Sequence, residues 1–302
     1  MYLYHFGIRE LPFTLTPNTQ YFFGLPSHQE ALQVLMTALK TGEGFIKVTG
    51  EVGTGKTLIC RKILNEMPDH FVSAYIPNPM LSPVELRRAV ATELGVELTE
   101  NSDQQEFTQR IQQRLINIHQ ERKSVVLIID EAQALPVESI ESLRLMTNLE
   151  TESRKLLQVV LFGQPELDEK LALPELRQLK QRITFSYFLR LMDADQVHQY
   201  VQHRMRVAGY SGSDLFDQRC AEMLFKASNG TPRVVNVLCH KALMLAYGQG
   251  RNRIDIDDIR SAIADTEAAK PIKQRYWLIW SLAIVMCFAL TLLVYFAPWS
   301  RQ

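Results

Sequence analysis

Residues 50–57 read Gly50-Glu51-Val52-Gly53-Thr54-Gly55-Lys56-Thr57, and this motif is the strongest indication of the fold. It fits the phosphate-binding loop of nucleoside triphosphatases, in which a glycine and four further residues precede Gly-Lys-Thr. Glycines let the backbone adopt positive φ, so that successive N–H groups turn toward one anion. Lys56 then reaches the β- and γ-phosphates, and the Thr57 hydroxyl can bind Mg²⁺. We therefore expect residues 50–57 to bind ATP with Mg²⁺ at Thr57, and not to form an ordinary glycine-rich turn.

The segments around this loop alternate between strand and helix patterns. Apolar stretches predict strands at 45–48, 71–76, 125–129, 158–162 and 183–189. Helical periodicity predicts helices at 28–40, 58–67, 83–94, 103–121, 137–147 and 166–171. The run 125–129 is continuously apolar, which is typical of a strand buried on both faces of a parallel sheet. This alternation predicts an α/β fold, with a doubly wound parallel sheet and right-handed crossovers.

The strand patterns stop after Asp193. Residues 194–208, 214–228, 232–247 and 256–268 all have the apolar spacing of helices. We therefore predict five parts, namely an α/β domain with an N-terminal extension at 1–192, an all-helical lid domain at 193–268, a basic linker at 269–276, a membrane helix at 277–297 and a tail at 298–302.

The predicted membrane helix rests on a long uncharged segment. No charged residue lies between Arg275 and Arg301, and residues 277–297 are almost wholly apolar. This length suffices to cross the roughly 30 Å hydrocarbon layer. Lys270, Lys273 and Arg275 precede the segment, whereas only Arg301 follows it, so the large N-terminal part should stay in the cytoplasm. The alternative is a buried core helix of a soluble domain.

Composition excludes some classes of function. Lys plus Arg equals Asp plus Glu at 33 each, so there is no global basic field for nucleic acid. Cys60, Cys220, Cys239 and Cys287 do not have the spacing of a metal or redox site, which indicates a reduced compartment. The N-terminus has neither the basic start nor the apolar run of a secretory signal.

Two acids follow the predicted strand 125–129. The carboxyl ends of parallel strands are where α/β sheets bind their ligands. Asp130 can hold Mg²⁺ there through water, and Glu131 can orient or deprotonate the attacking water. The alternative is that Glu131 is an ordinary surface acid.

Several motifs together give the chain a resemblance to the AAA+ ATPases. It resembles the ExeA/GspA group of general secretion ATPases and the related proteins of mannose-sensitive haemagglutinin (MSHA) pilus biogenesis, over roughly residues 1–268. Besides the phosphate loop, the residues that carry it are His5-Phe6-Gly7, Pro12-Phe13, Thr16-Pro17-Asn18, His28-Gln29-Glu30-Ala31-Leu32, Gly42-Glu43-Gly44-Phe45, Asp130-Glu131-Ala132-Gln133, Gly163-Gln164-Pro165-Glu166-Leu167 and Leu176-Arg177-Gln178-Leu179-Lys180-Gln181-Arg182-Ile183.

The resemblance implies roles for three further residues. Gln164 resembles the polar sensor that touches the γ-phosphate or the water, and Arg233 resembles the second sensor arginine. Arg182 resembles the arginine finger that a neighbouring subunit inserts, with Arg177 and Lys180 as competing candidates. An arginine supplied in trans implies a ring or filament of identical subunits.

The resemblance also implies a cellular role. It implies a membrane-anchored ATPase of the bacterial inner membrane, which contacts membrane lipid and the proteins that assemble a type IV-like pilus or a type II secretion machine. The longer family members carry a peptidoglycan-binding domain after their membrane span, where this sequence has only 298–302, so we expect the shorter pilus-associated member to be the closer match. One alternative is a DNA-binding regulator resembling transposition ATPases, against which the neutral charge and the apolar segment argue. Another is a nucleotide-dependent scaffold with negligible turnover, against which Glu131 argues.

Overall fold

The chain contains a five-stranded parallel sheet in the order β2-β3-β4-β1-β5. The computed structural model describes residues 2–97, 104–148, 155–271, 286 and 291. The strands are β1 (Phe45–Gly50), β2 (Phe71–Ile76), β3 (Ser124–Ile129), β4 (Leu157–Gly163) and β5 (Ile183–Leu189). Because β1 lies between β4 and β5, the loop after it opens at the sheet's carboxyl edge, next to the loop that follows β4. The predicted α/β parallel sheet is confirmed.

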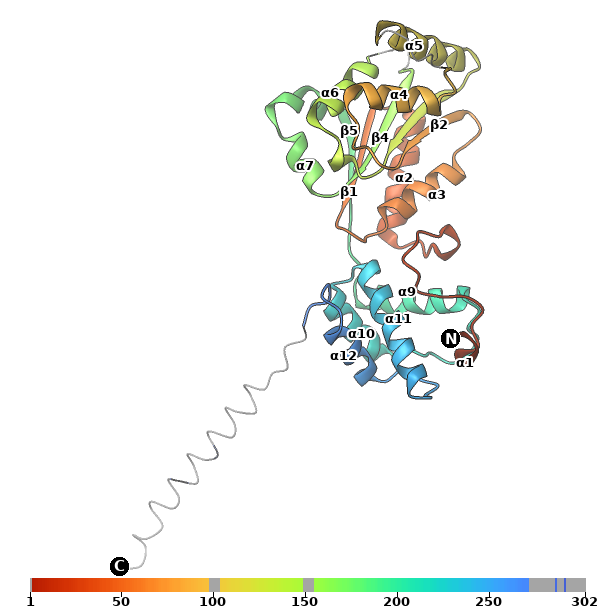
Figure 1. Cartoon of the computed structure of the whole chain (residues 1–302), viewed down its shortest axis with the longest axis vertical. Coiled ribbons are helices and arrows are strands. Elements are labelled where there is room, and N and C mark those ends of the chain that lie inside the picture. The colour runs from red at the N-terminus through yellow and green to blue at the C-terminus, as the bar shows by residue number, and fades with distance from the viewer. Residues whose placement is uncertain (1, 98–103, 149–154, 272–285, 287–290, 292–302) are drawn as a thin grey trace, which may run out of the picture.

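Helices cover both faces of this sheet (Figure 1). One face packs against α2 (Pro26–Thr41) and α3 (Lys56–Glu66). The other packs against α4 (Pro83–Glu93), α5 (Gln104–Gln120), α6 (Val137–Met146), α7 (Glu166–Leu171) and α8 (Arg177–Arg182). Strand β3 shows the alternation, because Leu127 and Ile129 join the second core whereas Val126 and Ile128 join the first. Both faces of β3 are therefore buried, as its apolar run predicts.

A helical bundle follows the sheet. It consists of α9 (Ala194–Val207), α10 (Gln218–Ser228), α11 (Pro232–Gly248) and α12 (Ile256–Ala264), which share one apolar core. Helix α10 begins four residues later than its apolar spacing predicts, because Asp217 caps it by accepting a hydrogen bond from the Cys220 N–H at 2.8 Å. Helix α12 ends before the predicted residue 268, and Ala269 instead returns to pack on the bundle core.

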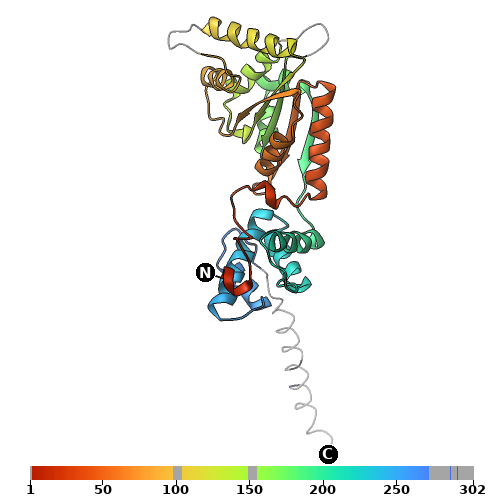
Figure 2. The same cartoon turned by 90° about the vertical axis from the view of Figure 1, so that its right-hand side faces the viewer.

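The N-terminal segment packs on the helical bundle. Its helix α1 (Leu3–Phe6) and the buried side chains of Tyr2, Ile8 and Phe13 belong to the bundle core. The Arg9 N–H donates to the Ala208 carbonyl at 2.8 Å and fixes the segment beside the end of α9. In the view of Figure 2, α1 lies against the bundle, well away from the sheet. The predicted domain boundaries placed this segment in the α/β domain at 1–192. Its apolar side chains pack on the helical bundle instead, since helices α2–α8 already cover both faces of the sheet.

The predicted membrane helix falls at residues 277–297. Within the described residues, none of the helices combines the length and the apolar character that crossing a bilayer requires. Residues 277–297 lie outside the described part of the chain, except for Met286 and Thr291.

The sheet and the helical bundle join at a close backbone contact. The Met192 N–H, between β5 and α9, donates to the Gly230 carbonyl at 3.0 Å. Gly230 has φ of 74°, and a Cβ on it would lie 2.0 Å from the Met192 carbonyl oxygen. Neither backbone can give way without moving the start of α11, so only glycine fits at this joint.

We predict that Gly230→Ala lowers the free energy of unfolding by about 2 kcal/mol or more, because a methyl group meets backbone at a residue with positive φ. Gly248→Ala is the matched control, because nothing lies within 4 Å of the Cβ position there. Its stability should stay within about 0.5 kcal/mol of the wild type. Denaturant unfolding of both variants measures the difference, and equal stability of the two would contradict this account of the joint.

Candidate functional site

The phosphate loop lies between the end of β1 and the start of α3. Gly53 and Gly55 have φ of 81° and 98°, the left-handed region that glycine adopts without steric cost. A side chain at Gly53 has no room, because its Cβ would lie 2.6 Å from the Cβ of Arg233. The Thr54 hydroxyl donates to the Glu51 carbonyl at 2.8 Å and closes the turn. The loop therefore directs the N-terminus of α3 into one cavity, as anion binding requires.

Lys56 is the first residue of α3 and only 5% exposed. Its Nζ donates to the carbonyl oxygens of Gly50 at 2.7 Å and Glu51 at 3.0 Å. Burial holds the pKa of this ammonium below its usual range, and the carboxylates of Glu131 and Asp130 oppose the effect. A buried ammonium at the base of an anion-binding loop favours a phosphate ligand, which would add negative charge beside it.

Asp130 and Thr57 form the part of the site that fits a magnesium ion. Asp130 is 2% exposed, and burial raises the pKa of its carboxyl. The Thr57 hydroxyl and the Glu131 N–H both donate hydrogen bonds to this carboxylate, which lowers the pKa and opposes the effect of burial. The bond from the Glu131 N–H is 3.0 Å long. Carboxylate and hydroxyl oxygens are ligands that Mg²⁺ prefers. No cluster of three or more His, Cys, Asp or Glu side chains that could hold a metal occurs among the described residues, so a magnesium ion would depend on nucleotide and water oxygens for its other ligands.

Glu131 is held by two glutamines. Its Oε2 accepts hydrogen bonds from Gln133 Nε2 at 2.6 Å and from Gln164 Nε2 at 3.0 Å. Gln133 Oε1 in turn accepts from the Gln164 N–H at 3.0 Å, which closes a three-residue network. Glu131 itself has φ of 52°, a left-handed conformation that is uncommon outside glycine. The network thus fixes the direction of the carboxylate, and Gln133 is a part of it to which sequence reasoning gave no role.

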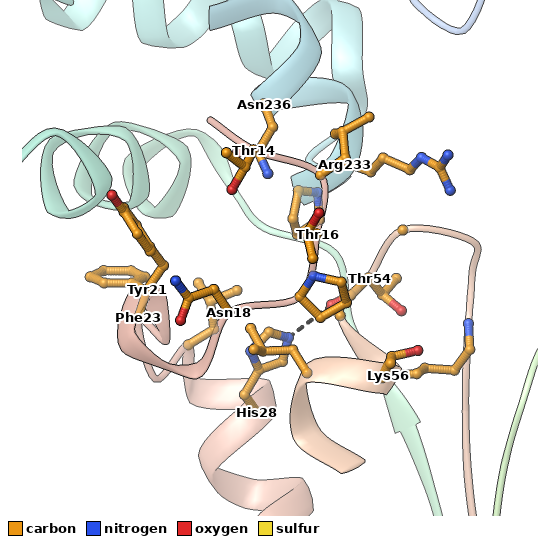
Figure 3. Close-up of a pocket in the computed structure, with 18 of the residues that line it drawn as sticks. Thr14, Thr16, Asn18, Tyr21, Phe23, His28, Thr54, Lys56, Arg233 and Asn236 are labelled. Atoms are coloured by element: carbon orange, nitrogen blue, oxygen red, sulfur yellow. Dashed lines mark hydrogen bonds between the residues drawn. The ribbon is translucent and has the colours of Figure 1, made fainter. Parts of the chain in front are cut away.

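Arg233 reaches the cavity from the first turn of α11. Its backbone N–H donates to the Gly53 carbonyl at 3.3 Å, and Figure 3 shows its side chain extending on the same side as Lys56. Tyr200 and Asn236 of the helical bundle also line the cavity and are joined by a hydrogen bond of 3.0 Å. The helical bundle therefore supplies one wall of the site.

The N-terminal segment supplies another wall that sequence reasoning missed. Residues 14–18, Tyr21, Phe23 and Leu25 line the cavity together with His28. The motif Thr16-Pro17-Asn18 contributed to the family resemblance, but no role followed from it. The signal was weak because this segment is irregular and meets the phosphate loop only through tertiary packing.

Arg182 does not reach the cavity of its own chain. It is the last residue of α8, directly before Ile183, which pairs with Phe45 at the start of β1. The phosphate loop follows the other end of β1, so the length of the strand separates the two. Arg182 donates to the Asn148 side chain, and the competing candidates Arg177 and Lys180 lie exposed on the same helix.

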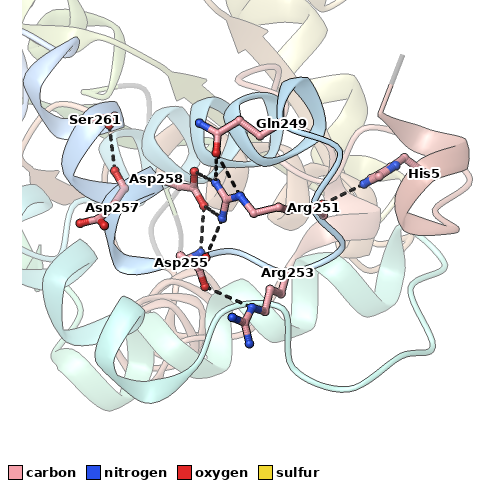
Figure 4. A network of polar contacts seen from close by, with 8 residues as sticks. All are labelled: His5, Gln249, Arg251, Arg253, Asp255, Asp257, Asp258 and Ser261. Atoms are coloured by element: carbon pink, nitrogen blue, oxygen red, sulfur yellow. Dashed lines mark hydrogen bonds and ion pairs between the residues drawn. The ribbon is translucent and has the colours of Figure 1, made fainter.

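A second charged network lies at the turn between α11 and α12 and is structural. Arg251 pairs there with both Asp255 and Asp258, and Gln249 accepts two further bonds from its guanidinium (Figure 4). The Arg251 carbonyl bonds to His5 Nε2 at 2.8 Å, so the opening His5-Phe6-Gly7 motif fastens the N-terminus to the helical bundle.

The comparisons with known sequences agree with this geometry. Residues 39–171 match the family model described as AAA domain. The chain is 38% identical over 303 residues to general secretion pathway protein A of Aeromonas hydrophila, an alignment that covers 100% of this chain. The chain spans about half the length of that relative, 54% of it.

Several solved structures are similar to this chain in fold. The ORC2 protein of Aeropyrum pernix aligns with a TM-score of 0.61 at 14% identity, over 87% of this chain and 74% of its own. The RuvB Holliday junction branch migration motor of Thermotoga maritima aligns with a TM-score of 0.52 at 17% identity, over 85% and 73%. At these identities the likeness concerns the fold alone. The chain is thus a P-loop α/β protein that matches the AAA domain family over residues 39–171 and a secretion-pathway protein along its whole length.

Proposed function

We propose that this chain is a Mg²⁺-dependent ATPase, anchored in the inner membrane, that assists assembly of a type IV-like (MSHA) pilus or a type II secretion machine. One observation carries the ATPase assignment. Lys56, Thr57, Glu131, Gln164 and Arg233, from four separate segments, line a single cavity. The similarity to general secretion pathway protein A supports the secretion-related setting.

The residues of the cavity divide the work of hydrolysis. Lys56 and the backbone N–H groups of the loop bind the β- and γ-phosphates. Thr57 and Asp130 hold the magnesium ion, which when bound neutralises charge on the phosphate oxygens. Glu131 orients the attacking water and accepts its proton, while Gln164 contacts the water or the γ-phosphate. Arg233 joins the γ-phosphate to the helical bundle, so that nucleotide occupancy biases the position of the bundle.

A complete site requires a second subunit in this proposal. Arg182 lies at the surface, remote from its own cavity, which is the arrangement expected of an arginine that serves a neighbour. Its guanidinium would stabilise charge on the phosphoryl group in transfer. We therefore propose a homo-oligomeric ring or filament.

The apolar segment 277–297 provides the proposed anchor. The basic residues that precede it favour a cytoplasmic position for the ATPase part. Partners would then be inner-membrane pilus or secretion proteins together with membrane lipid. The solved structures do not favour the DNA-binding alternative, because those of similar fold share less than 25% identity with this chain.

Lys56→Ala should weaken ATP binding by about 100-fold, because the loop loses its charged contact with the phosphates. Lys40→Ala, at an exposed position of α2, is the matched control and should bind normally. Titration calorimetry with MgATP measures both variants. Full ATP affinity in Lys56→Ala would remove the phosphate-loop assignment.

Glu131→Gln should bind ATP with near wild-type affinity but hydrolyse it about 100-fold more slowly, because the amide cannot accept the proton of the water. Glu138→Gln, an exposed acid in the first turn of α6, controls for the loss of a charge. Release of inorganic phosphate is the measurement. Near wild-type turnover in Glu131→Gln would exclude the catalytic role.

The same Glu131→Gln variant also tests the cellular role, because a slow ATPase remains longer in its ATP-bound complexes. The chain should appear in the membrane fraction, and inner-membrane pilus or secretion proteins should co-purify with it from detergent extracts. Recovery of DNA alone would support the DNA-binding alternative instead.

Subunits carrying Arg182→Ala, when mixed with Lys56→Ala subunits, should regain part of the ATPase activity that each lacks alone. The intact arginine of the second variant would then serve the intact phosphate loop of the first. Parallel mixtures with Arg177→Ala and Lys180→Ala show which side chain is the finger. Absence of complementation by Arg182→Ala, with assembly intact by light scattering, would refute its role in trans.

A further inference from the structure

His28 is a buried titratable residue to which the proposed reaction gives no role. It lies in the first turn of α2 and is 5% exposed. Its Nε2 forms a hydrogen bond of 2.9 Å with the Thr54 carbonyl oxygen in the phosphate loop. Figure 3 shows this bond entering the loop beside Lys56. A side chain from outside the motif thus contacts the backbone that binds phosphate.

The bond has a defined direction. A carbonyl oxygen only accepts hydrogen bonds, so Nε2 carries the proton and donates. Burial lowers the pKa of His28, which keeps the ring neutral near neutral pH. His28 therefore adds no positive charge to the site, and its influence on phosphate binding acts through geometry.

The geometry concerns one peptide unit. In a trans peptide the C=O and the following N–H point in opposite directions. The Thr54 carbonyl is held toward His28, so the N–H of Gly55, a residue that lines the cavity, points away from the ring. Without this bond the unit could rotate about Gly55, whose φ of 98° lies in a region where glycine moves freely. The hydrogen bond thus holds one of the N–H groups available to an anion.

The imidazole ring is itself held from several sides. A Cβ on Gly55 would lie 3.2 Å from His28 Cε1, so the ring packs directly on the loop. Phe22 stacks on it with ring centroids 5.9 Å apart and an interplanar angle of 27°. Packing on both the loop and Phe22 restricts rotation of the donor.

The helical turn that carries His28 is fastened to β5. Ser27 Oγ accepts a hydrogen bond from the Arg190 N–H at 2.8 Å. The Glu30 carboxylate accepts from the Arg190 guanidinium at 2.6 Å and from the Tyr187 hydroxyl at 2.7 Å. These contacts join the helical turn that carries the donor to the end of β5.

We propose that His28 is a positioning residue that orients the Thr54–Gly55 peptide for phosphate binding. The inference rests on the proposed nucleotide binding and extends it to a residue outside the phosphate-loop motif. It assigns to the His28-Gln29-Glu30 motif a specific task, with His28 as the donor and Glu30 as part of its anchor.

Two substitutions of the 302-residue chain, purified in mild detergent, test this role. His28→Leu removes the donor and keeps an apolar side chain, whereas the Nε2 of His28→Gln can occupy the same place and donate. Displacement of a fluorescent ADP analogue by ATP, ADP and adenosine gives three affinities for each protein. His28→Leu should bind ATP and ADP roughly threefold to tenfold more weakly, with adenosine changed less than twofold. His28→Gln should restore both phosphate-dependent affinities.

Each contrary result has a distinct meaning. Wild-type ATP affinity in His28→Leu would overturn the inference, as would an equal loss for adenosine and ADP, which would assign His28 to packing of the whole cavity. If the His28→Leu protein does not fold, the His28→Gln variant decides the question. A folded His28→Gln protein that binds ATP and ADP more weakly than the wild type would also overturn the inference. The proposed function fails separately, if the wild type binds ATP no better than Lys56→Ala.

Discussion

The structure depends on one reversal of the backbone between Gly50 and Lys56. Strand β1 lies in the interior of the sheet, so the chain must turn back over the sheet as α3 without a wide loop. Two glycines in the left-handed region permit the turn. The first hydrogen bond of α3 runs from the Ile59 N–H to the Gly55 carbonyl, so the N–H groups just before Ile59 need an anion or water as partner. The need for such a partner at the carboxyl edge of the sheet is the constraint that the surrounding residues meet.

Three segments far apart in the sequence close around this turn. Strands β3 and β4 are parallel neighbours of one another, so the residues that follow them, Glu131 and Gln164, lie within hydrogen-bond distance. The helical bundle reaches the loop through the backbone of Arg233, and its position is fixed by the contact between Met192 and Gly230. Gly53 packs against Arg233 of the helical bundle, and Thr54 is hydrogen-bonded to His28 of α2. The phosphate loop therefore contacts both the bundle and α2.

The strands were predictable because each is a compact apolar run, and the continuous run in β3 also indicated burial on both faces. Predictions were weaker where packing overrides local pattern. Helix α8, which was not predicted, has Leu179 as its single buried residue, so it has no repeated apolar positions. The start of α10 depends on the cap at Asp217, and the N-terminal aromatics pack on the helical bundle because the sheet has no uncovered face for them. The phosphate loop, Asp130 and Glu131 were predictable because each motif is contiguous and follows a strand.

The amino-acid sequence alone was enough to predict that a phosphate loop follows a buried strand and that two acids follow another. Those properties are local, since backbone freedom at glycine and the apolar character of a strand depend on adjacent residues. The folded structure was needed to show that Gln164 holds Glu131, that His28 holds the loop, and that Arg182 lies far from its own cavity. These contacts depend on strand order and on which helix covers which face. A hydrogen bond between residues far apart in the chain leaves no periodic pattern in the sequence, so folding alone reveals it.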